Sequence, residues 1–442
     1  MCCSCEHALL MIRGEGIVKQ VKAILLGAGA RGALCYAPYA TRFPHELQFV
    51  AVAEPQQVRR DSFAADHKIP EDNVTANWED LLNRPKFADA VIICTQDRMH
   101  YEPAKKALEL GYHVLIEKPM SPVARECLDL ELSAIANNRL LTTCFVLRYT
   151  SFWSAIKKVI VRGDIGNVVS IQLNENVGYY HMAHSYVRGN WRNRSISSPM
   201  ILAKSSHDMD LIGWLIGEKC MRVGSFGSLF HFHEGNAPIG ATDRCTDGCP
   251  HEKDCPFAAA QFYLNEDNRV WAAHFTTKFD HDSILEQLRV NSYGRCVYKC
   301  DNDVVDHQVV NMEFENGATA LFSMSGFTHD CSRQVQIMGT KGEIRGSMEA
   351  NQFSIYDFLT STETVVKVRA DSGDHGGGDH GLIRSFVADV ASIESGNTEA
   401  LTPVTSATQG HMMAFAAEES RLQNGTPIEL KDFIMSLGGE FI

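Results

Sequence analysis

The sequence predicts an α/β fold: a doubly wound parallel sheet in the N-terminal third, then an α+β domain with a large, open, mostly antiparallel sheet. Three observations support this prediction. An apolar run at residues 21–26 leads directly into a glycine-rich turn and a helix-compatible segment. Strand-like and helical segments then alternate up to about residue 147, which implies right-handed βαβ units. After residue 150, runs of alternating apolar and polar residues are typical of half-exposed strands.

The glycine-rich turn has the spacing G-x-G-x-x-G, formed by Gly27, Gly29 and Gly32. Gly27 permits the tight turn, Gly29 lets the backbone approach a pyrophosphate, and Gly32 lets the helix pack on the strand. The start of that helix offers free N–H groups to phosphates, and it comprises Ala30, Arg31 and Gly32. A glycine turn in some other α/β protein is the alternative interpretation, but the preceding strand favours a Rossmann dinucleotide-binding domain.

A second strand-like run, 49–53, ends in Glu54, 22 positions beyond Gly32 and near the ~20 typical of a ribose-binding acid. Its carboxylate would accept hydrogen bonds from ribose hydroxyls and repel a 2′-phosphate. We therefore expect NAD as the cofactor rather than NADP. Arg59 and Arg60, a turn downstream, are the residues that leave NADP open.

The remaining elements follow from apolar runs and helical spacing. In the first domain we expect helices at 56–66, 78–82, 99–110 and 121–137, and strands at 88–95, 113–117 and 140–145. In the second we expect helices at 152–161, 382–393 and 411–422, and strands at 168–173, 309–314, 318–324, 333–338 and 343–346. A flexible leader, 1–19, would precede a dinucleotide-binding domain, 20–148, and a substrate-binding and oligomerisation domain, 149–442.

Composition limits the partners of the 442-residue chain. A formal net charge of -13 argues against nucleic acid and anionic membranes, because both attract basic surfaces. No apolar run approaches the ~18 residues of a membrane span, and the apolar stretch at 8–12 is too short for a signal peptide. Most of the 14 cysteines sit alone in apolar segments, as small buried hydrophobes do. We expect a cytoplasmic protein.

Four landmarks occur in order along the chain: the glycine turn, C-T-Q-D-R-M-H at 94–100, Glu117-Lys118-Pro119, and His207-Asp208-Met209-Asp210. With the predicted layout they closely resemble the Gfo/Idh/MocA family of NAD(P)-dependent sugar and cyclitol oxidoreductases, over about residues 20–430. The chain is most similar to a subgroup marked by three further patterns: H-S-Y-V-R-G-N-W at 184–191, C-x3-C-P at 245–250 and H-G-G-G-D at 375–379.

The resemblance implies where the chemistry occurs. Lys118, at the carboxyl end of a strand, would hydrogen-bond a substrate hydroxyl, and the Lys118–Pro119 peptide bond is often cis in this family. His207 would take the hydroxyl proton, because a neutral imidazole suits proton transfer near pH 7. Asp208 or Asp210 would orient its ring. The cofactor would also contact Thr95, His100, Glu117 and Lys118.

One position departs from the family pattern. Many members carry an aspartate four residues before the histidine, and here that position is Ala203, followed by Lys204. A second cation near Lys118 would depress the pKa of one lysine and help it act as a base. Lys204 would equally suit an anionic substrate group such as a uronate carboxylate. Both interpretations remain open.

The segment 179–192 is rich in aromatic residues, histidine and arginine, which are the residue types that bind sugars. Rings stack on pyranose faces, and arginine grips hydroxyls. An aromatic interface patch is the alternative. The candidate substrate contacts are Tyr180, His184, Arg188, Trp191 and Asp208, with His375 and Asp379 as mobile contacts from the glycine-rich loop.

A cysteine cluster, Cys245-x3-Cys249-x-His251-x3-Cys255, has the ligand types for a structural zinc ion. Reduced structural thiols and a disulfide are the alternatives. Cys296 and Cys300 would supply a replacement ligand.

These observations predict an NAD-dependent oxidoreductase acting on a secondary hydroxyl of a sugar, sugar derivative or cyclitol. One alternative is a glycosidase or lyase that recycles NAD by transient sugar oxidation and elimination. A second is a non-catalytic NAD-binding sensor. The open sheet would expose an apolar face in a monomer, so we expect a homo-dimer or homo-tetramer.

Overall fold

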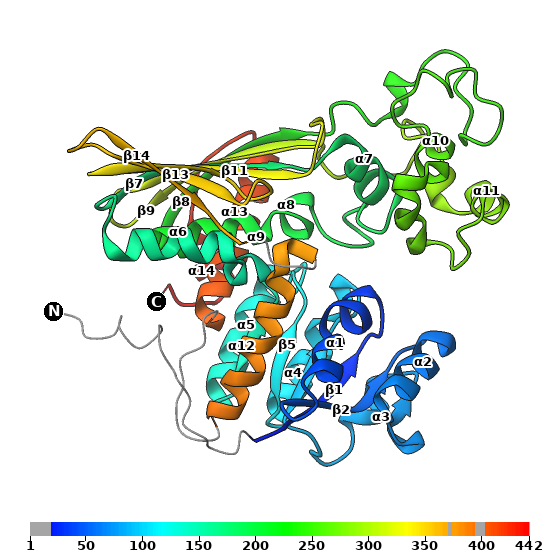
Figure 1. Cartoon of the computed structure of the whole chain (residues 1–442), viewed down its shortest axis with the longest axis horizontal. Coiled ribbons are helices and arrows are strands. Elements are labelled where there is room, and N and C mark those ends of the chain that lie inside the picture. The colour runs from blue at the N-terminus through cyan, green and yellow to red at the C-terminus, as the bar shows by residue number, and fades with distance from the viewer. Residues whose placement is uncertain (1–18, 370–373, 394–402, 442) are drawn as a thin grey trace.

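A computed structural model describes residues 19–369, 374–393 and 403–441, so nearly all of the predicted leader lies outside the described residues. The chain forms a six-stranded sheet with the order β3-β2-β1-β4-β5-β6 and a nine-stranded sheet with the order β14-β13-β12-β11-β7-β10-β9-β8-β15. These sheets form the lower and upper layers in Figure 1. The predicted α/β fold class is confirmed.

The first sheet is entirely parallel, and its central strands are mostly apolar and buried because helices cover both faces. Its strands are β1 (Val21–Leu26), β2 (Leu47–Ala53), β3 (Val74–Thr75), β4 (Ala90–Ile93), β5 (His113–Ile116) and β6 (Leu141–Thr143). The helices between them are α1 (Pro38–Arg42), α2 (Gln57–His67), α3 (Glu79–Leu82), α4 (Tyr101–Glu109) and α5 (Ala124–Ala136). The segment after the glycine turn is a π-helix, η1 (Ala30–Tyr36), that runs into α1.

The second sheet is antiparallel except where β7 and β10 pair in parallel. Its strands are β7 (Val168–Asn176), β8 (Cys220–Ser228), β9 (His307–Phe314), β10 (Thr319–Ser325), β11 (Ser332–Gly339), β12 (Gly342–Ser347), β13 (Gln352–Asp357), β14 (Thr362–Lys367) and β15 (Ile428–Glu429). Burial alternates along β9 and β10, so one face of this sheet packs inward and the other faces outward.

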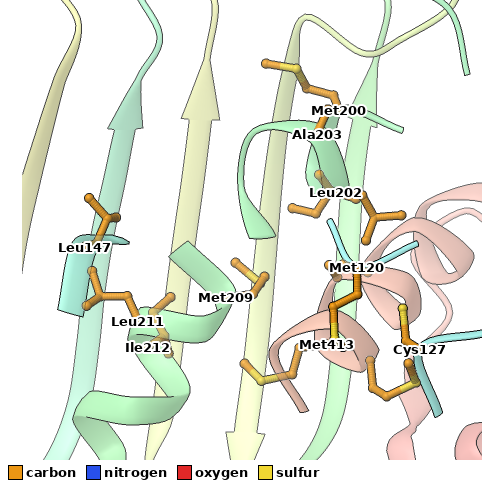
Figure 2. Packing of buried hydrophobic residues seen from close by; sticks show 14 of the residues in the cluster. Met120, Cys127, Leu147, Met200, Leu202, Ala203, Met209, Leu211, Ile212 and Met413 are labelled. Atoms are coloured by element: carbon orange, nitrogen blue, oxygen red, sulfur yellow. The ribbon is translucent and has the colours of Figure 1, made fainter. Parts of the chain in front are cut away.

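Helices lie between the two sheets (Figure 1). They are α6 (Ser151–Arg162), α8 (Met200–Ala203), α9 (Ser206–Ile216), α13 (Val404–Leu422) and α14 (Leu430–Ser436). Methionines of these helices, among them Met209 and Met413, pack in one buried cluster with Met120 from the loop after β5 (Figure 2). Unbranched thioether side chains fill irregular gaps well. Lys118, just after β5, bonds Ala203, the last residue of α8, so the carboxyl ends of the first sheet's strands face the turn between α8 and α9.

Helix α12 (Gly378–Ile393) comes late in the chain yet packs on the first domain (Figure 1). Its Leu382, Ile383 and Phe386 join the buried cluster that contains Leu25 and Val52 of the parallel sheet. The predicted domain boundary at 148/149 remains a prediction, and α12 shows that the chain crosses it again.

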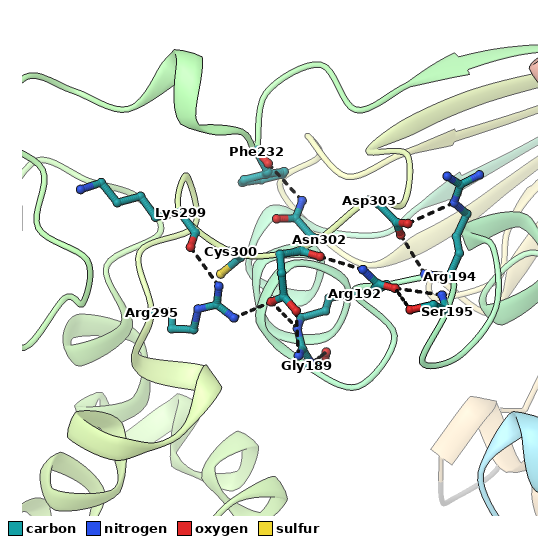
Figure 3. Close-up of polar contacts among 12 residues, drawn as sticks. Gly189, Arg192, Arg194, Ser195, Phe232, Arg295, Lys299, Cys300, Asn302 and Asp303 are labelled. Carbon is teal, nitrogen blue, oxygen red and sulfur yellow. Dashed lines mark hydrogen bonds and ion pairs between the residues drawn. The ribbon is translucent and has the colours of Figure 1, made fainter.

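An insertion between β8 and β9, residues 229–306, forms a small body beside the sheet (Figure 1). It carries α10 (Ala259–Leu264), the 3-10 segment η7 (Glu266–His274) and α11 (His281–Val290) around its own buried cluster. The insertion packs against α7 (Tyr179–His181) and the π-helix η5 (Met182–Arg188). Its end, near Asp301 and Asp303, is tied to Arg192 and Arg194 by ion pairs (Figure 3).

Candidate functional site

The glycine turn has the geometry that its spacing predicts. Gly27 has a φ of +93°, and a Cβ added there would lie 2.5 Å from the carbonyl oxygen of Cys94. A Cβ on Gly32 would lie 2.3 Å from the carbonyl oxygen of Gly27. At Gly29 the same test meets only the tip of Arg59, at 3.8 Å, so this side of the turn is open. The turn therefore fits a group that approaches the backbone at Gly29.

Glu54, at the end of β2, is buried and held by two backbone groups. Its oxygens accept hydrogen bonds from the N–H of Ala28 and of Gln56, each at 2.9 Å. The carboxylate is thus fixed beside the turn that carries Gly29. Arg60 bonds the Glu54 carbonyl oxygen at 2.6 Å and does not pair with the carboxylate.

Lys118 follows β5, and its peptide bond to Pro119 is cis, as the family resemblance implied. Its ammonium Nζ donates to the carbonyl oxygen of Ala203 at 2.5 Å. Ala203, where the family resemblance led us to expect an aspartate, therefore still supplies an acceptor, from its main chain. Burial, with the positive charges of Lys204 and Arg31, lowers the pKa of Lys118, while Glu117 opposes the shift.

His207, in the first turn of α9, lies close to Lys118 and to His375. Its ring centroid is 5.9 Å from that of His375, and its Nδ1 is buried with no hydrogen-bond partner among the described residues. Burial, followed by the charge of Lys118, holds the pKa of His207 well below its ordinary value. The imidazole is therefore neutral at pH 7, the form that accepts a proton.

Lys204 belongs to a buried ion network. Its Nζ lies 3.0 Å from a carboxylate oxygen of Glu175, which is only 2% exposed. Arg333 pairs with Glu175 at 2.7 Å and with Asp208 at 2.8 Å. The network balances two cations with two carboxylates, so Glu175 and Arg333 are site residues that the sequence analysis missed.

Neither predicted orienting aspartate contacts the ring of His207. The carboxylate of Asp208 bonds Arg333, and that of Asp210 forms a buried ion pair with Arg148. Burial raises the pKa of Asp208, and the neighbouring Arg333 opposes the shift. The H-D-x-D pattern therefore places one histidine at the site and uses its acids to anchor α9.

A second network joins the glycine turn to the glycine-rich C-terminal loop. Arg31 bonds Glu117 at 2.6 Å and Asp379 at 2.5 Å, and Tyr36 donates to Glu117 at 2.7 Å. Asp379 also bonds His375 Nδ1 at 3.0 Å. His375 is thus held near His207 by Asp379, which is itself bonded to Arg31 of the glycine turn. The H-G-G-G-D pattern was the sequence signal for both His375 and Asp379, and a substrate contact by either remains a prediction.

Thr95 and His100 brace the loop after β4. The His100 ring contacts the carbonyl oxygen of Pro119 at 2.7 Å and that of Thr95 at 3.1 Å. Asp97, between them, accepts from Ser197 and Ser198 at 2.5 and 2.9 Å. These contacts position the Lys118 turn, and cofactor contact by Thr95 and His100 remains a prediction.

Four of the predicted substrate residues lie next to the insertion and fall into two groups. Tyr180 is half-buried and packs on Phe262 and Trp271 of the insertion, and Trp191 packs on Tyr186. The other two are buried against the insertion and have their polar atoms satisfied there. His184 bonds the Tyr263 hydroxyl at 2.7 Å, and Arg188 bonds the carbonyl oxygens of Arg295 and Phe257 at 2.7 Å. The structure gives His184 and Arg188 the role of fastening the insertion, and a substrate role for the four residues remains a prediction.

The described side chains of Cys245, Cys249, His251 and Cys255 are not at metal-binding geometry, and zinc at this loop remains a prediction. The His251 Nε2 lies 2.8 Å from the Ile239 carbonyl oxygen. Within residues 19–369, 374–393 and 403–441, no three His, Cys, Asp or Glu side chains are placed to hold a metal ion. The cysteines of this stretch are free thiols.

Comparison with known proteins settles the family. The model described as "Oxidoreductase family, NAD-binding Rossmann fold" matches residues 21–145, and "Oxidoreductase family, C-terminal alpha/beta domain" matches residues 157–430. The chain belongs to the Gfo/Idh/MocA family. It is an NAD-binding oxidoreductase. Its relatives include dehydrogenases that act on CH–OH groups.

Two of those relatives are from Bacillus subtilis. YteT, an oxidoreductase by name, is 26% identical over 371 residues, which cover 79% of this chain and 84% of YteT. The scyllo-inositol 2-dehydrogenase (NADP(+)) IolW is 25% identical over 187 residues, 42% of this chain and 49% of IolW.

Solved structures confirm the fold. A levoglucosan dehydrogenase in complex with NADH and L-sorbose superposes with a TM-score of 0.69 at 18% identity, covering 93% of this chain and 99% of that one. An oxidoreductase from Agrobacterium radiobacter in complex with NAD+, L-tartaric acid and magnesium gives 0.67 at 13% identity, covering 94% and 99%. In the part of the chain that the structure describes, no helix combines the length and apolar character needed to cross a membrane.

Proposed function

We propose that this enzyme uses NAD to oxidise, or NADH to restore, a secondary hydroxyl of a sugar, sugar derivative or cyclitol. The observation that carries the proposal is the meeting of Lys118 and the buried, neutral His207 opposite the glycine turn. Both side chains lie where the carboxyl ends of the parallel strands face α8 and α9. Relatives named as inositol dehydrogenases and a levoglucosan dehydrogenase of the same fold support the substrate class.

In this reaction NAD, when bound, accepts the hydride from the carbinol carbon. His207 takes the hydroxyl proton, because its imidazole is neutral and one ring nitrogen is without a partner among the described residues. Lys118, fixed on the Ala203 carbonyl oxygen, donates to the same hydroxyl oxygen and stabilises the negative charge that develops there. Lys204 is occupied by Glu175, so we assign it an electrostatic role and not that of a proton acceptor.

The preference for NAD over NADP rests on Glu54. Its carboxylate is fixed beside the glycine turn, where it would repel a 2′-phosphate. The relative IolW is named for NADP(+), so the cofactor varies within the family. We propose a cytoplasmic, reduced setting, which the free thiols of buried Cys127 and Cys144 suit.

A screen of sugars, glycosides and inositols tests the proposal, with NADH absorbance and released aglycone followed in parallel. A dehydrogenase accumulates NADH with turnover, whereas an NAD-recycling glycosidase releases aglycone with no net change in absorbance. Ala203 stands where the family resemblance led us to expect an aspartate, with Lys204 beside it, and this difference is the reason to measure glycosidase activity as well. Lys118→Ala should lower kcat at least about 100-fold and leave NAD binding intact. Unchanged activity in that variant would rule out the catalytic role of Lys118. A wild type that binds NAD but turns over none of the screened compounds would favour the NAD-binding sensor.

A further inference from the structure

The insertion gathers free cysteines around one small cavity. Cys245, Cys249, Cys255 and Cys296 all line it, and none is in a disulfide. The first three lie within one loop, but Cys296 comes from the segment after α11. The fold of the insertion is therefore what brings the fourth sulfur to the cavity. His251 also lines the cavity, but its ring contacts the Ile239 carbonyl oxygen.

Backbone hydrogen bonds converge on these sulfurs. Cys249 is bonded by the backbone of His251, Cys255 by that of Phe257, and Cys296 by that of Tyr298. In each case the partner stands two residues after the cysteine. At two of the positions the intervening residue is proline, which has no N–H of its own. These bonds fix each sulfur relative to its own turn, whereas burial raises the pKa of the Cys255 and Cys296 thiols.

A buried cation faces the same sulfurs. Arg188 is 3% exposed, and its Nη2 lies 3.6 Å from Cys245 Sγ. Its other bonds go to backbone carbonyl oxygens, and no described carboxylate is among the groups that act on its charge. A buried guanidinium without an anionic partner is costly. The cavity thiols are the groups in reach that can supply the missing negative charge.

We propose that Cys245, Cys249, Cys255 and Cys296 bind one zinc ion as four thiolates, with Arg188 as their buried counter-charge. Four sulfur ligands are the set that closed, tetrahedral structural zinc sites use. Each thiol gives its proton to solvent as its sulfur–zinc bond forms, and Arg188 offsets part of the net negative charge that results. The described side chains are not yet at ligand geometry, so binding requires rotation of the cysteines about Cα–Cβ.

The proposed ion would shape the oxidoreductase site without taking part in the reaction. It joins the two ends of the insertion, whose Trp271 packs on Tyr180 and His181. His181 in turn lies near Lys204 and Lys118. With four protein ligands, the zinc has no open position for substrate. Loss of the ion should therefore loosen the insertion before it alters the chemistry at Lys118.

Metal analysis of the purified full-length protein, made without a histidine tag, tests this inference. We expect about one zinc per chain in the wild type and less than about a fifth of that in Cys249→Ser and Cys296→Ser. His251→Ala and Cys300→Ser are matched controls that should keep the zinc, because Cys300 bonds the Cys296 carbonyl oxygen and does not line the cavity. Iron in place of zinc, no metal, or zinc lost from His251→Ala but kept in Cys296→Ser would each overturn the proposal.

A second measurement covers variants that fail to fold. Titrating the wild type with a mercurial reagent should release its zinc in step with modification of four thiols, followed with a chromogenic chelator. Cobalt-grown protein should show strong sulfur-to-cobalt charge-transfer absorption, which a site without thiolate ligands lacks. Neither readout depends on NAD or on activity, so the zinc proposal and the proposed function can fail separately.

Discussion

Single residues of the glycine turn have separable tasks, and paired substitutions distinguish them. Gly32→Ala should lower the melting temperature by several degrees, because its Cβ would lie 2.3 Å from the Gly27 carbonyl oxygen. Gly29→Ala should leave the melting temperature nearly unchanged, since the space there is open. The same methyl group should weaken NAD binding at least about 10-fold, by blocking the approach of the pyrophosphate. Calorimetry with NAD and thermal unfolding of both variants check this, and unaltered NAD affinity in Gly29→Ala would contradict it.

The proton-accepting residue predicts a pH profile. Burial lowers the pKa of His207 below the value of about 6.5 that is usual for histidine, and so do the positive charges of Lys118, His375, Arg333 and Lys204. The imidazole therefore stays neutral at pH values where a free histidine would already be protonated. The acidic limb of kcat/KM should therefore lie below pH 6.5, with activity lost as the pH falls through that lowered pKa.

Glu175→Gln should move that acidic limb further down, by about half a pH unit. The substitution removes a negative charge from the network that holds Lys204 and Arg333, and the uncompensated cations then disfavour protonation of His207. Glutamine preserves the shape, so a loss caused by packing alone would lower kcat without moving the limb. The measurement is kcat/KM against pH for both proteins, and an upward movement would count against His207 as the base.

Among the elements, α12 lies far from the first domain in sequence, yet it contributes Asp379 to the site. It begins beside the glycine-rich loop and presents Asp379 to Arg31 and His375. The aspartate thus connects the glycine turn, the Glu117 end of β5 and the His207 side of the site. A helix near the end of the chain therefore contributes a side chain to the Arg31 network of the first domain.

Asp379→Asn tests this anchor through its pH dependence. Burial acts to raise the pKa of Asp379, but hydrogen bonds from His375 and Arg31, with the charge of Arg31, lower it to about 2. A depressed carboxyl pKa stabilises the fold above the unfolded value of about 4, here by about 2 kcal/mol, and the effect is lost as the pH falls toward 2. The melting temperature of the variant should lie a few degrees below that of the wild type at pH 6. The gap should close below pH 4, and a constant gap would show that the ion pair is not its cause.

The elements also show what the sequence could and could not predict. Strands 21–26 and 113–117 were predictable because local apolar runs and a glycine turn define them. Lys118 and His207 were predicted as site residues from motifs that keep fixed spacing, and the structure brings the two side chains close together. Glu175 and Arg333 carry no local signal, because their roles arise when β7 and β11 pair side by side. His184 and Arg188 look like sugar ligands in a list of residue types, yet the insertion that buries them lies some 40 to 120 positions further along.

At the scale of the whole molecule, the outer face of the nine-stranded sheet combines apolar and charged side chains. Val309 of β9, Leu321 of β10 and Phe226 of β8 point outward and are 37%, 38% and 58% exposed. Phe226 and Val309 stand opposite each other in the register of β8 and β9. The helices that pack on this sheet lie on its inner side, between the two layers (Figure 1).

This outer face predicts self-association into a homo-dimer or homo-tetramer. Apolar side chains gathered on an open sheet lose contact with water when two copies pack face to face, and a symmetric pair buries each of them twice. Leu321→Glu should shift the mass measured by light scattering from oligomer to monomer, because it would place like charges against each other across the two-fold axis. Leu359→Glu, which alters a residue 93% exposed in the turn between β13 and β14, is the matched control and should leave the mass unchanged. A wild type that is already monomeric at micromolar concentration would refute the prediction, and a Leu321→Glu protein that stays oligomeric would place the interface elsewhere.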